Sequence, residues 1–137
     1  MQKYTHLIFA FLLFMLFNFI FHFPIYLSLF AFLGAMLPDL DIKIKKLHRK
    51  IFHNVWFLMI ILFILFEMSL VNRTIAIIFS IGFLSHLIAD SLTHMGIMPF
   101  WPIKKPKFNG PFRTGSFGEF GLMLIMILVI LVIGNFI

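Results

Sequence analysis

Long apolar segments alternate with short polar segments along the chain. Four of them come near the roughly 20 residues that a helix needs to cross a bilayer: Tyr4 to Phe21, Ile51 to Phe66, Thr74 to Leu92 and Glu119 to Ile137. A fifth, Ile25 to Leu37, is shorter, because its 13 residues rise only about 20 Å as a helix. We therefore predict an all-α, integral membrane bundle of about five helices, of which the second is short.

Two proline-containing stretches flank this short segment. Pro24 cannot continue a helix and restrains the residue before it, so the first two helices are expected to form a hairpin. At the other end, Pro38 and Asp39 begin at a depth below the lipid headgroups. A polar, irregular backbone at that depth is tolerated only when it is buried in protein or lines a wet cavity.

The composition indicates one membrane-embedded domain over residues 1–137. Hydrophobic residues make up 62% of the chain and charged residues 12%, against about 45–50% and 25% in soluble domains. The chain contains no cysteine. Disulfides and thiolate metal sites are therefore excluded, and any metal would be held by imidazole and carboxylate groups.

Basic residues gather on one side of the predicted bundle. Five helices place the N-terminus and the loops 38–50 and 93–118 on one side, and Arg73 and the C-terminus on the other. The first side carries ten of the 11 basic residues: Lys3, Lys43, Lys45, Lys46, Arg49, Lys50, Lys104, Lys105, Lys107 and Arg113. By the positive-inside rule this side is cytoplasmic. We expect a multi-pass protein of the inner cell membrane, and no nucleic-acid partner.

Most ionisable residues fall at this same end of the predicted helices. His86 and Asp90 lie four residues apart near the end of the fourth segment, so both side chains share a helix face and could bind one cation. In many helices the two side chains of such a pair contact only each other and bind no ion. A carboxylate within a membrane is nevertheless a functional candidate unless a partner neutralises it.

Two aspartates and two histidines flank the gap between the second and third segments. Asp39 and Asp41 follow the short segment, and either could cap the next element or act as an oxygen ligand while the other orients an imidazole. His53 begins an apolar run and is expected to face the bundle. His48, beside basic residues, also suits a position facing the headgroups.

His6 and Glu119 complete the set of candidates. His6 lies about one turn inside the first segment, and Glu119 opens the last. Each also has an ordinary structural interpretation. His6 would be a hydrogen-bonded interior residue, and Glu119 would be a carboxylate favoured by a helix N-terminus. Both nevertheless share a membrane face with the other candidates, whereas His22 falls at the opposite end and is excluded.

Imidazole and carboxylate ligands on one membrane face predict a hydrolytic metal site. Zinc accepts both ligand types, and a site with three protein ligands keeps a position for water. Bound metal lowers the pKa of that water to about 7. Ser85 and Ser91 adjoin the His86 and Asp90 pair but lack the separate base and orienting group of a catalytic triad.

The order of five motifs resembles that of a known family. The motifs are Thr5-His6, Gly34-Ala35-Met36-Leu37-Pro38-Asp39-Leu40-Asp41, His48-Arg49 with His53, Gly82-Phe83-Leu84-Ser85-His86 with Asp90, and Thr93 with Gly96. Over nearly its whole length the chain resembles the YdjM-like family of inner-membrane-associated, metal-dependent hydrolases, also labelled LexA-binding. That family is in turn similar to zinc-dependent phospholipases C and single-strand nucleases, which are all-helical phosphodiesterases.

The resemblance implies a main Zn²⁺ site formed by Asp39 or Asp41 with His53, His86 and Asp90. It implies that His6 and Glu119 serve a neighbouring ion. The chain lacks the long histidine-rich second half of the soluble enzymes, so we expect one or two ions.

We therefore expect a membrane-bound hydrolase that cleaves a phosphoester of a lipid or another membrane-associated substrate. The metal ligands would come from His6, Asp39, Asp41, His53, His86 and Asp90, and the catalytic groups from Asp39, Asp41, His53, Asp90 and Glu119. His48, Arg49 and Arg113 are candidates for binding an anionic substrate, because Arg suits bidentate phosphate contact.

Two other classes of protein compete with this interpretation. One is a non-catalytic membrane protein with a structural metal site, which binds a cytosolic partner through its basic loops. The other is a transporter, which is disfavoured because the segments offer almost no polar residues toward the far leaflet.

Overall fold

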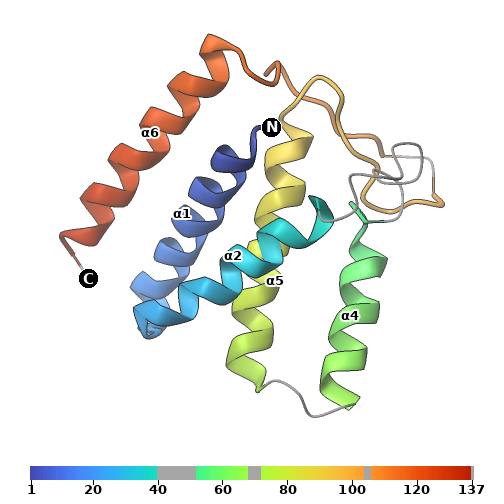
Figure 1. Cartoon of the computed structure of the whole chain (residues 1–137), viewed down its shortest axis with the longest axis vertical. Helices are drawn as coiled ribbons and strands as arrows, with labels where there is room; N and C mark the ends of the chain where they lie inside the picture. Colours follow the sequence, from blue (N-terminus) through green and yellow to red (C-terminus); the bar gives the residue numbers. More distant parts are fainter. Residues whose placement is uncertain (40–51, 68–71, 104–105, 137) are drawn as a thin grey trace.

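The computed structural model describes residues 1–39, 52–67, 72–103 and 106–136 as an assembly of helices (Figure 1). Five α-helices form it: α1 (Lys3–Phe21), α2 (Ser28–Met36), α4 (Val55–Glu67), α5 (Arg73–Ser91) and α6 (Phe117–Gly134). Single 3-10 turns, η1 (Ile25–Leu27) and η2 (Leu37–Asp39), flank α2. The described residues form no β-strand, only two isolated bridges. The all-α prediction with a short second helix is confirmed.

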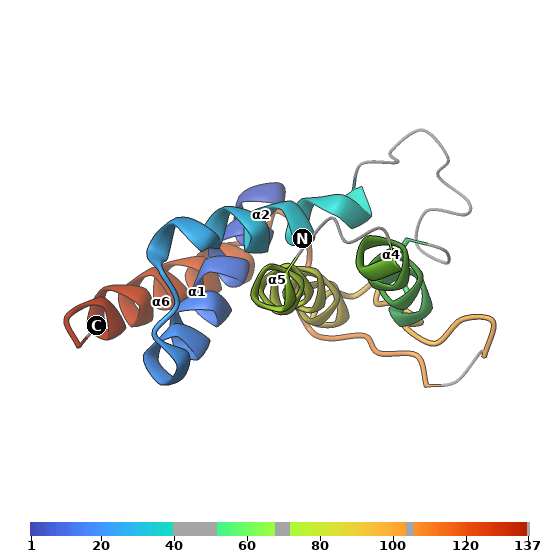
Figure 2. The same ribbon diagram turned by 90° about the horizontal axis from the view of Figure 1, so that it is seen from below.

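Three of the helices, α1, α5 and α6, are long and apolar enough to cross a membrane. They lie alongside one another, and α2 crosses over α1 and α5 (Figures 1 and 2). As expected, α1 and α2 form a hairpin. The residue after the end of α1, His22, has a left-handed backbone conformation (φ 51°) and donates its N–H to the Asn18 carbonyl.

Helix α4 is shorter than predicted. Phe52 to Asn54 form a turn, and the helix begins at Val55, so the predicted start at Ile51 is too early. The Asn54 side chain accepts the Trp56 N–H at 2.8 Å, and the Val55 N–H donates to the Pro99 carbonyl at 2.9 Å. An N-cap and a contact from a distant loop therefore set the start of this helix.

Close backbone contact between α2 and α5 positions one side of the site. A Cβ atom at Gly34 would overlap the Phe79 carbonyl, and one at Gly82 would overlap the Ala31 carbonyl. Small residues let membrane helices approach this closely. The contact brings the end of α2 against the last turns of α5, where His86 and Asp90 lie.

Candidate metal centre

Five predicted site residues meet at one end of the bundle. His6 comes from the first turns of α1, Asp39 from η2, His53 from the turn before α4, and His86 and Asp90 from the last turns of α5. The three histidines and Asp90 are at most 3% exposed, whereas the Asp39 side chain is 28% exposed. The expected convergence of these helix ends is therefore observed.

Asp90 is the centre of the cluster. Its Oδ2 lies 3.1 Å from His53 Nε2 and 3.6 Å from His86 Nε2. Its Oδ1 lies 3.3 Å from His6 Nε2 and 2.9 Å from the amino group of Met1. Burying a carboxylate is costly unless charged or hydrogen-bonding groups surround it, and here both oxygens have such partners.

The orientation of His86 is set by α2. His86 Nδ1 lies 2.7 Å from the Ala35 carbonyl oxygen, and since a carbonyl can only accept, Nδ1 donates. With Nδ1 as the donor, a neutral imidazole carries its lone pair on Nε2, which faces the cluster; this arrangement orients metal-binding histidines. The His6 ring stacks on the His86 ring, with centroids 3.9 Å apart and an interplanar angle of 12°.

The donor atoms have the spacing that a single metal ion requires. Two ligands 2.0–2.1 Å from a tetrahedral zinc ion lie about 3.3 Å apart. The three separations among His53 Nε2, His86 Nε2 and Asp90 Oδ2 are 3.0, 3.1 and 3.6 Å. Imidazole nitrogen and carboxylate oxygen are also suitable donors for zinc, so these residues fit the ion.

A second group of donors overlaps the first. His6, Asp39 and His86 also place ligand atoms within 4.8 Å of one another, and the Asp39 Oδ1 lies 3.8 Å from His86 Nε2. His86 belongs to both groups, and its Nδ1 is already bonded to Ala35. One nitrogen binds one ion, so the two groups of three cannot both be filled with His86 as a ligand.

Glu119 lies in neither group of candidate ligands. Its Oε1 accepts from the Gln2 N–H and the Thr5 hydroxyl, both at 2.7 Å, and its Oε2 accepts from the Gly115 N–H at 2.6 Å. The residue is 3% exposed. The carboxylate thus joins the start of α6 to the start of α1 through neutral donors.

The structure leaves the other predicted residues outside the cluster or untested. Asp41, His48 and Arg49 lie outside the described residues. Arg113 is exposed, and its carbonyl accepts the Ser116 N–H. His22 lies at the opposite end of α1, in agreement with its exclusion.

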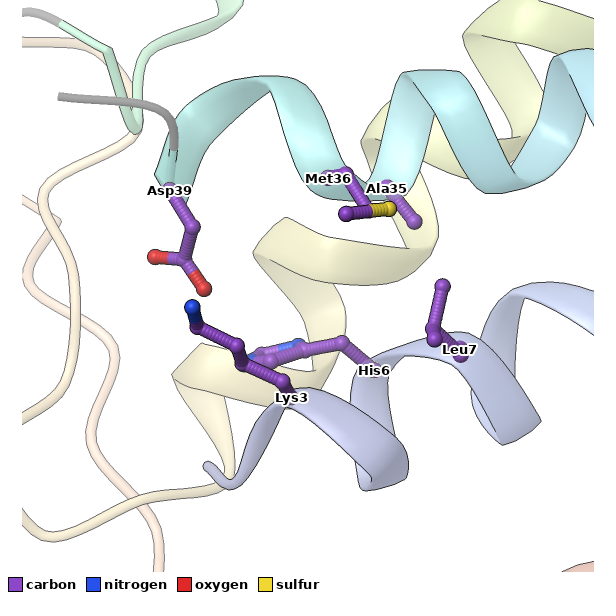
Figure 3. A pocket seen from close by; sticks show the side chains of 6 residues that line it. All are labelled: Lys3, His6, Leu7, Ala35, Met36 and Asp39. Atoms are coloured by element: carbon purple, nitrogen blue, oxygen red, sulfur yellow. The ribbon is translucent and has the colours of Figure 1, made fainter.

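A cavity beside the cluster reveals a residue that the sequence interpretation missed. It has a volume of about 70 Å³ and is lined by Lys3, His6, Leu7, Ala35, Met36 and Asp39. Figure 3 shows the Lys3 ammonium and the Asp39 carboxylate pointing toward each other. Lys3 and His6 lie three residues apart on α1, a spacing that places both on one helix face and that could have identified Lys3.

Apolar helices with a buried histidine and aspartate cluster at one end define an integral membrane protein with a candidate metal centre. The chain belongs to the YdjM inner membrane protein family, whose family model matches residues 1–136. No curated protein and no solved structure matches the chain. The description of the matched family gives a membrane location and no reaction.

Proposed function

We propose that this protein is a membrane-bound, metal-dependent hydrolase that cleaves a phosphoester of a lipid or another membrane-associated substrate. The observation that carries the proposal is the convergence of His53 Nε2, His86 Nε2 and the Asp90 carboxylate beside a cavity. Buried ionisable groups within membrane helices typically mark functional sites.

In this proposal one Zn²⁺ is held by His53, His86 and Asp90. The shared use of His86 by both donor groups favours one ion over two. When bound, the ion supplies a water that ionises near neutral pH and a Lewis acid for a phosphoryl oxygen. Three protein ligands leave a coordination position for that chemistry.

Asp39 is the proposed general base. Its side chain is the most exposed of the cluster, lines the cavity, and has Oδ1 3.8–3.9 Å from His86 and His53 Nε2. A carboxylate within reach of the attacking water can accept its proton. His6, stacked on His86, would position that ring, and Arg113, with His48 and Arg49, remains a proposed contact for an anionic headgroup.

The proposal also places the cluster at the cytoplasmic face of the inner membrane. Because the chain has no cysteine, single cysteines can test this with a membrane-impermeant thiol reagent. Lys107→Cys, at the end with the cluster, should be protected in intact cells, whereas Glu67→Cys, at the far end of α4, should be labelled. The reverse pattern would contradict the orientation.

The decisive experiment measures phosphate release by the purified protein with zinc. Substrates are lipid phosphomonoesters and phosphodiesters in vesicles, and water-soluble p-nitrophenyl phosphate esters. We expect turnover that is lost on chelation and in Asp90→Asn and Asp39→Asn, with Glu67→Gln as the matched control far from the site. Bound metal without turnover on any of these esters would contradict the hydrolase and favour a structural metal.

A further inference from the structure

We infer that the protein binds a phosphate-bearing glycerolipid, with the phosphate in the cavity at Lys3 and an acyl chain in an apolar groove between α1, α2 and α6. The identification of this lipid as the substrate rests on the proposed function. The binding site itself rests on the shape and the chemistry of two neighbouring compartments.

The groove is apolar along its whole lining. It has a volume of about 300 Å³ and is formed by Leu7, Ile8, Phe11, Phe32, Ile127, Ile130 and Leu131. Two of the three contributing helices, α1 and α6, are candidate membrane spans. A groove of this lining between such helices opens toward lipid chains rather than toward water.

The groove adjoins the cavity beside the metal centre. Leu7 lines both compartments, with Lys3 and His6 on the polar side of it and Ile8 and Phe11 on the apolar side. A second groove, of about 320 Å³, runs between α4 and α5 past Leu87, but it shares no lining residue with the cavity. The shared residue Leu7 therefore singles out the groove at α1.

Along the membrane normal, the cavity and the groove follow each other in the same order as the phosphate and the acyl chain of a lipid. Lys3 and Phe11 are eight residues apart on α1, about 12 Å along the axis. Three members of the cluster, His6, His86 and Asp90, lie within the first or last turns of helices long enough to span, and therefore near headgroup level. A lipid phosphate belongs at that level, with its acyl chain extending from there into the hydrocarbon.

Lys3 supplies charge complementarity for the phosphate. Its ammonium group points across the cavity toward the Asp39 carboxylate (Figure 3), and Lys is a common phosphate-binding residue that acts as a point charge. A phosphate there would lie beside the His6 and Asp39 side chains that line the same cavity. One charge-assisted contact corresponds to about a tenfold or larger change in affinity.

The test uses a phosphonate analogue of phosphatidic acid, which cannot be hydrolysed, with a photoreactive group in its acyl chain. The matching diacylglycerol probe, which lacks the phosphorus group, is the control, and both are placed in phosphatidylcholine vesicles with zinc present. We expect crosslinks on the residues lining the groove, about tenfold more with the phosphonate than with the diacylglycerol. Lys3→Ala should remove that preference and Lys3→Arg should keep it.

A matched pair of variants tests the groove itself. Ile127→Trp fills the groove and should abolish the phosphonate-dependent crosslinks, whereas Leu128→Trp, next to it at 64% exposure and outside the lining, should leave them unchanged. Both positions are at the surface, so the helix tolerates the added ring. Equal crosslinking by the two Trp variants would overturn the inference.

The same preparation separates this inference from the proposed function. Labelling that spreads to α4, outside the groove, without preference for the phosphonate would overturn the lipid site, even if soluble esters are hydrolysed. Groove labelling with that preference supports the lipid site even if no ester is hydrolysed, in which case the hydrolase alone fails.

Discussion

Two carboxylates at the same end of the bundle are equally buried but differently surrounded. Asp90 and Glu119 are each 3% exposed, near the end of α5 and the start of α6. Around Asp90 stand three imidazole nitrogens and an amino group. Around Glu119 stand two backbone N–H groups and a hydroxyl.

This difference distinguishes a candidate metal ligand from a structural contact. Imidazole nitrogens carry lone pairs that a cation can share with a carboxylate, whereas a backbone N–H can only donate. The position of a carboxylate at the membrane interface therefore does not by itself indicate a metal site. The groups around each carboxylate indicate its role, and they favour Asp90 as a ligand and Glu119 as the link between α1 and α6.

The largest expected contrast is in metal binding. His86→Ala removes a ligand shared by both candidate groups, and affinity for zinc should fall by more than about 100-fold, since loss of a supporting partner alone costs 10–100-fold. Glu119→Gln should keep close to one ion per chain. Elemental analysis of the purified variants gives the stoichiometry. Stoichiometric zinc in His86→Ala would remove this residue from the site, and loss of zinc in Glu119→Gln would erase the contrast.

Stability should show the opposite pattern. Glu119→Ala leaves the Thr5 hydroxyl and the backbone N–H groups of Gln2 and Gly115 without their acceptor, at a cost of about 2–3 kcal/mol. The midpoint of thermal unfolding in detergent should fall while zinc is retained. Glu67→Ala, an exposed glutamate at the far end, serves as the control and should leave the midpoint unchanged. An unaltered midpoint in Glu119→Ala would show that the three contacts contribute little.

A glycine substitution connects helix packing to the metal centre. Gly82→Ala forces α2 away from α5, because its Cβ would overlap the Ala31 carbonyl, at a cost of about 1–3 kcal/mol. The displacement should also weaken the bond from His86 to Ala35, and with it zinc affinity by about tenfold. Gly121→Ala, where the added Cβ meets no atom within 4 Å, is the matched control. Thermal unfolding and zinc titration measure both effects, and identical behaviour of the two variants would contradict the link.

The smallest expected effect lies at the end of the bundle away from the cluster. Asn72 caps α5 by accepting the Ile75 N–H at 2.9 Å, so Asn72→Ala should cost about 1 kcal/mol and leave zinc binding unchanged. Asn72→Asp, which keeps a capping oxygen, should restore the unfolding midpoint. A change in zinc affinity on Asn72→Ala would show that the two ends are coupled.

The convergence of the site residues was predictable because apolar length and loop charge constrain a membrane chain so strongly. Once the helices alternate in direction, His6, His53, His86 and Asp90 have to fall at one end. The same argument placed Glu119 at this end of the bundle, but it could not identify the neighbours that set Glu119 apart from the cluster. The neighbours of Glu119 depend on how α1 and α6 pack. Because both helices are almost uniformly apolar, their sequences show no periodic pattern that would predict the packing faces.

The remaining features depend on contacts between distant segments. The bond from His86 to the Ala35 carbonyl requires the close approach at Gly34 and Gly82. The start of α4 depends on Pro99, a loop residue 44 positions beyond Val55. Contacts with backbone carbonyls of this kind cannot be predicted from the pattern of side chains along the sequence.

The α1–α2 hairpin has a consequence for the surrounding lipid. From His6 to the turn at His22, α1 rises about 24 Å, and the shorter arm that returns to Asp39 rises about as far. The hydrocarbon layer of a typical bilayer is about 30 Å thick. We expect lipids beside the hairpin to meet this hydrophobic mismatch of about 5 Å by local thinning, at a modest energetic cost for each ångström. Such thinning would bring lipid phosphates closer to the buried histidines.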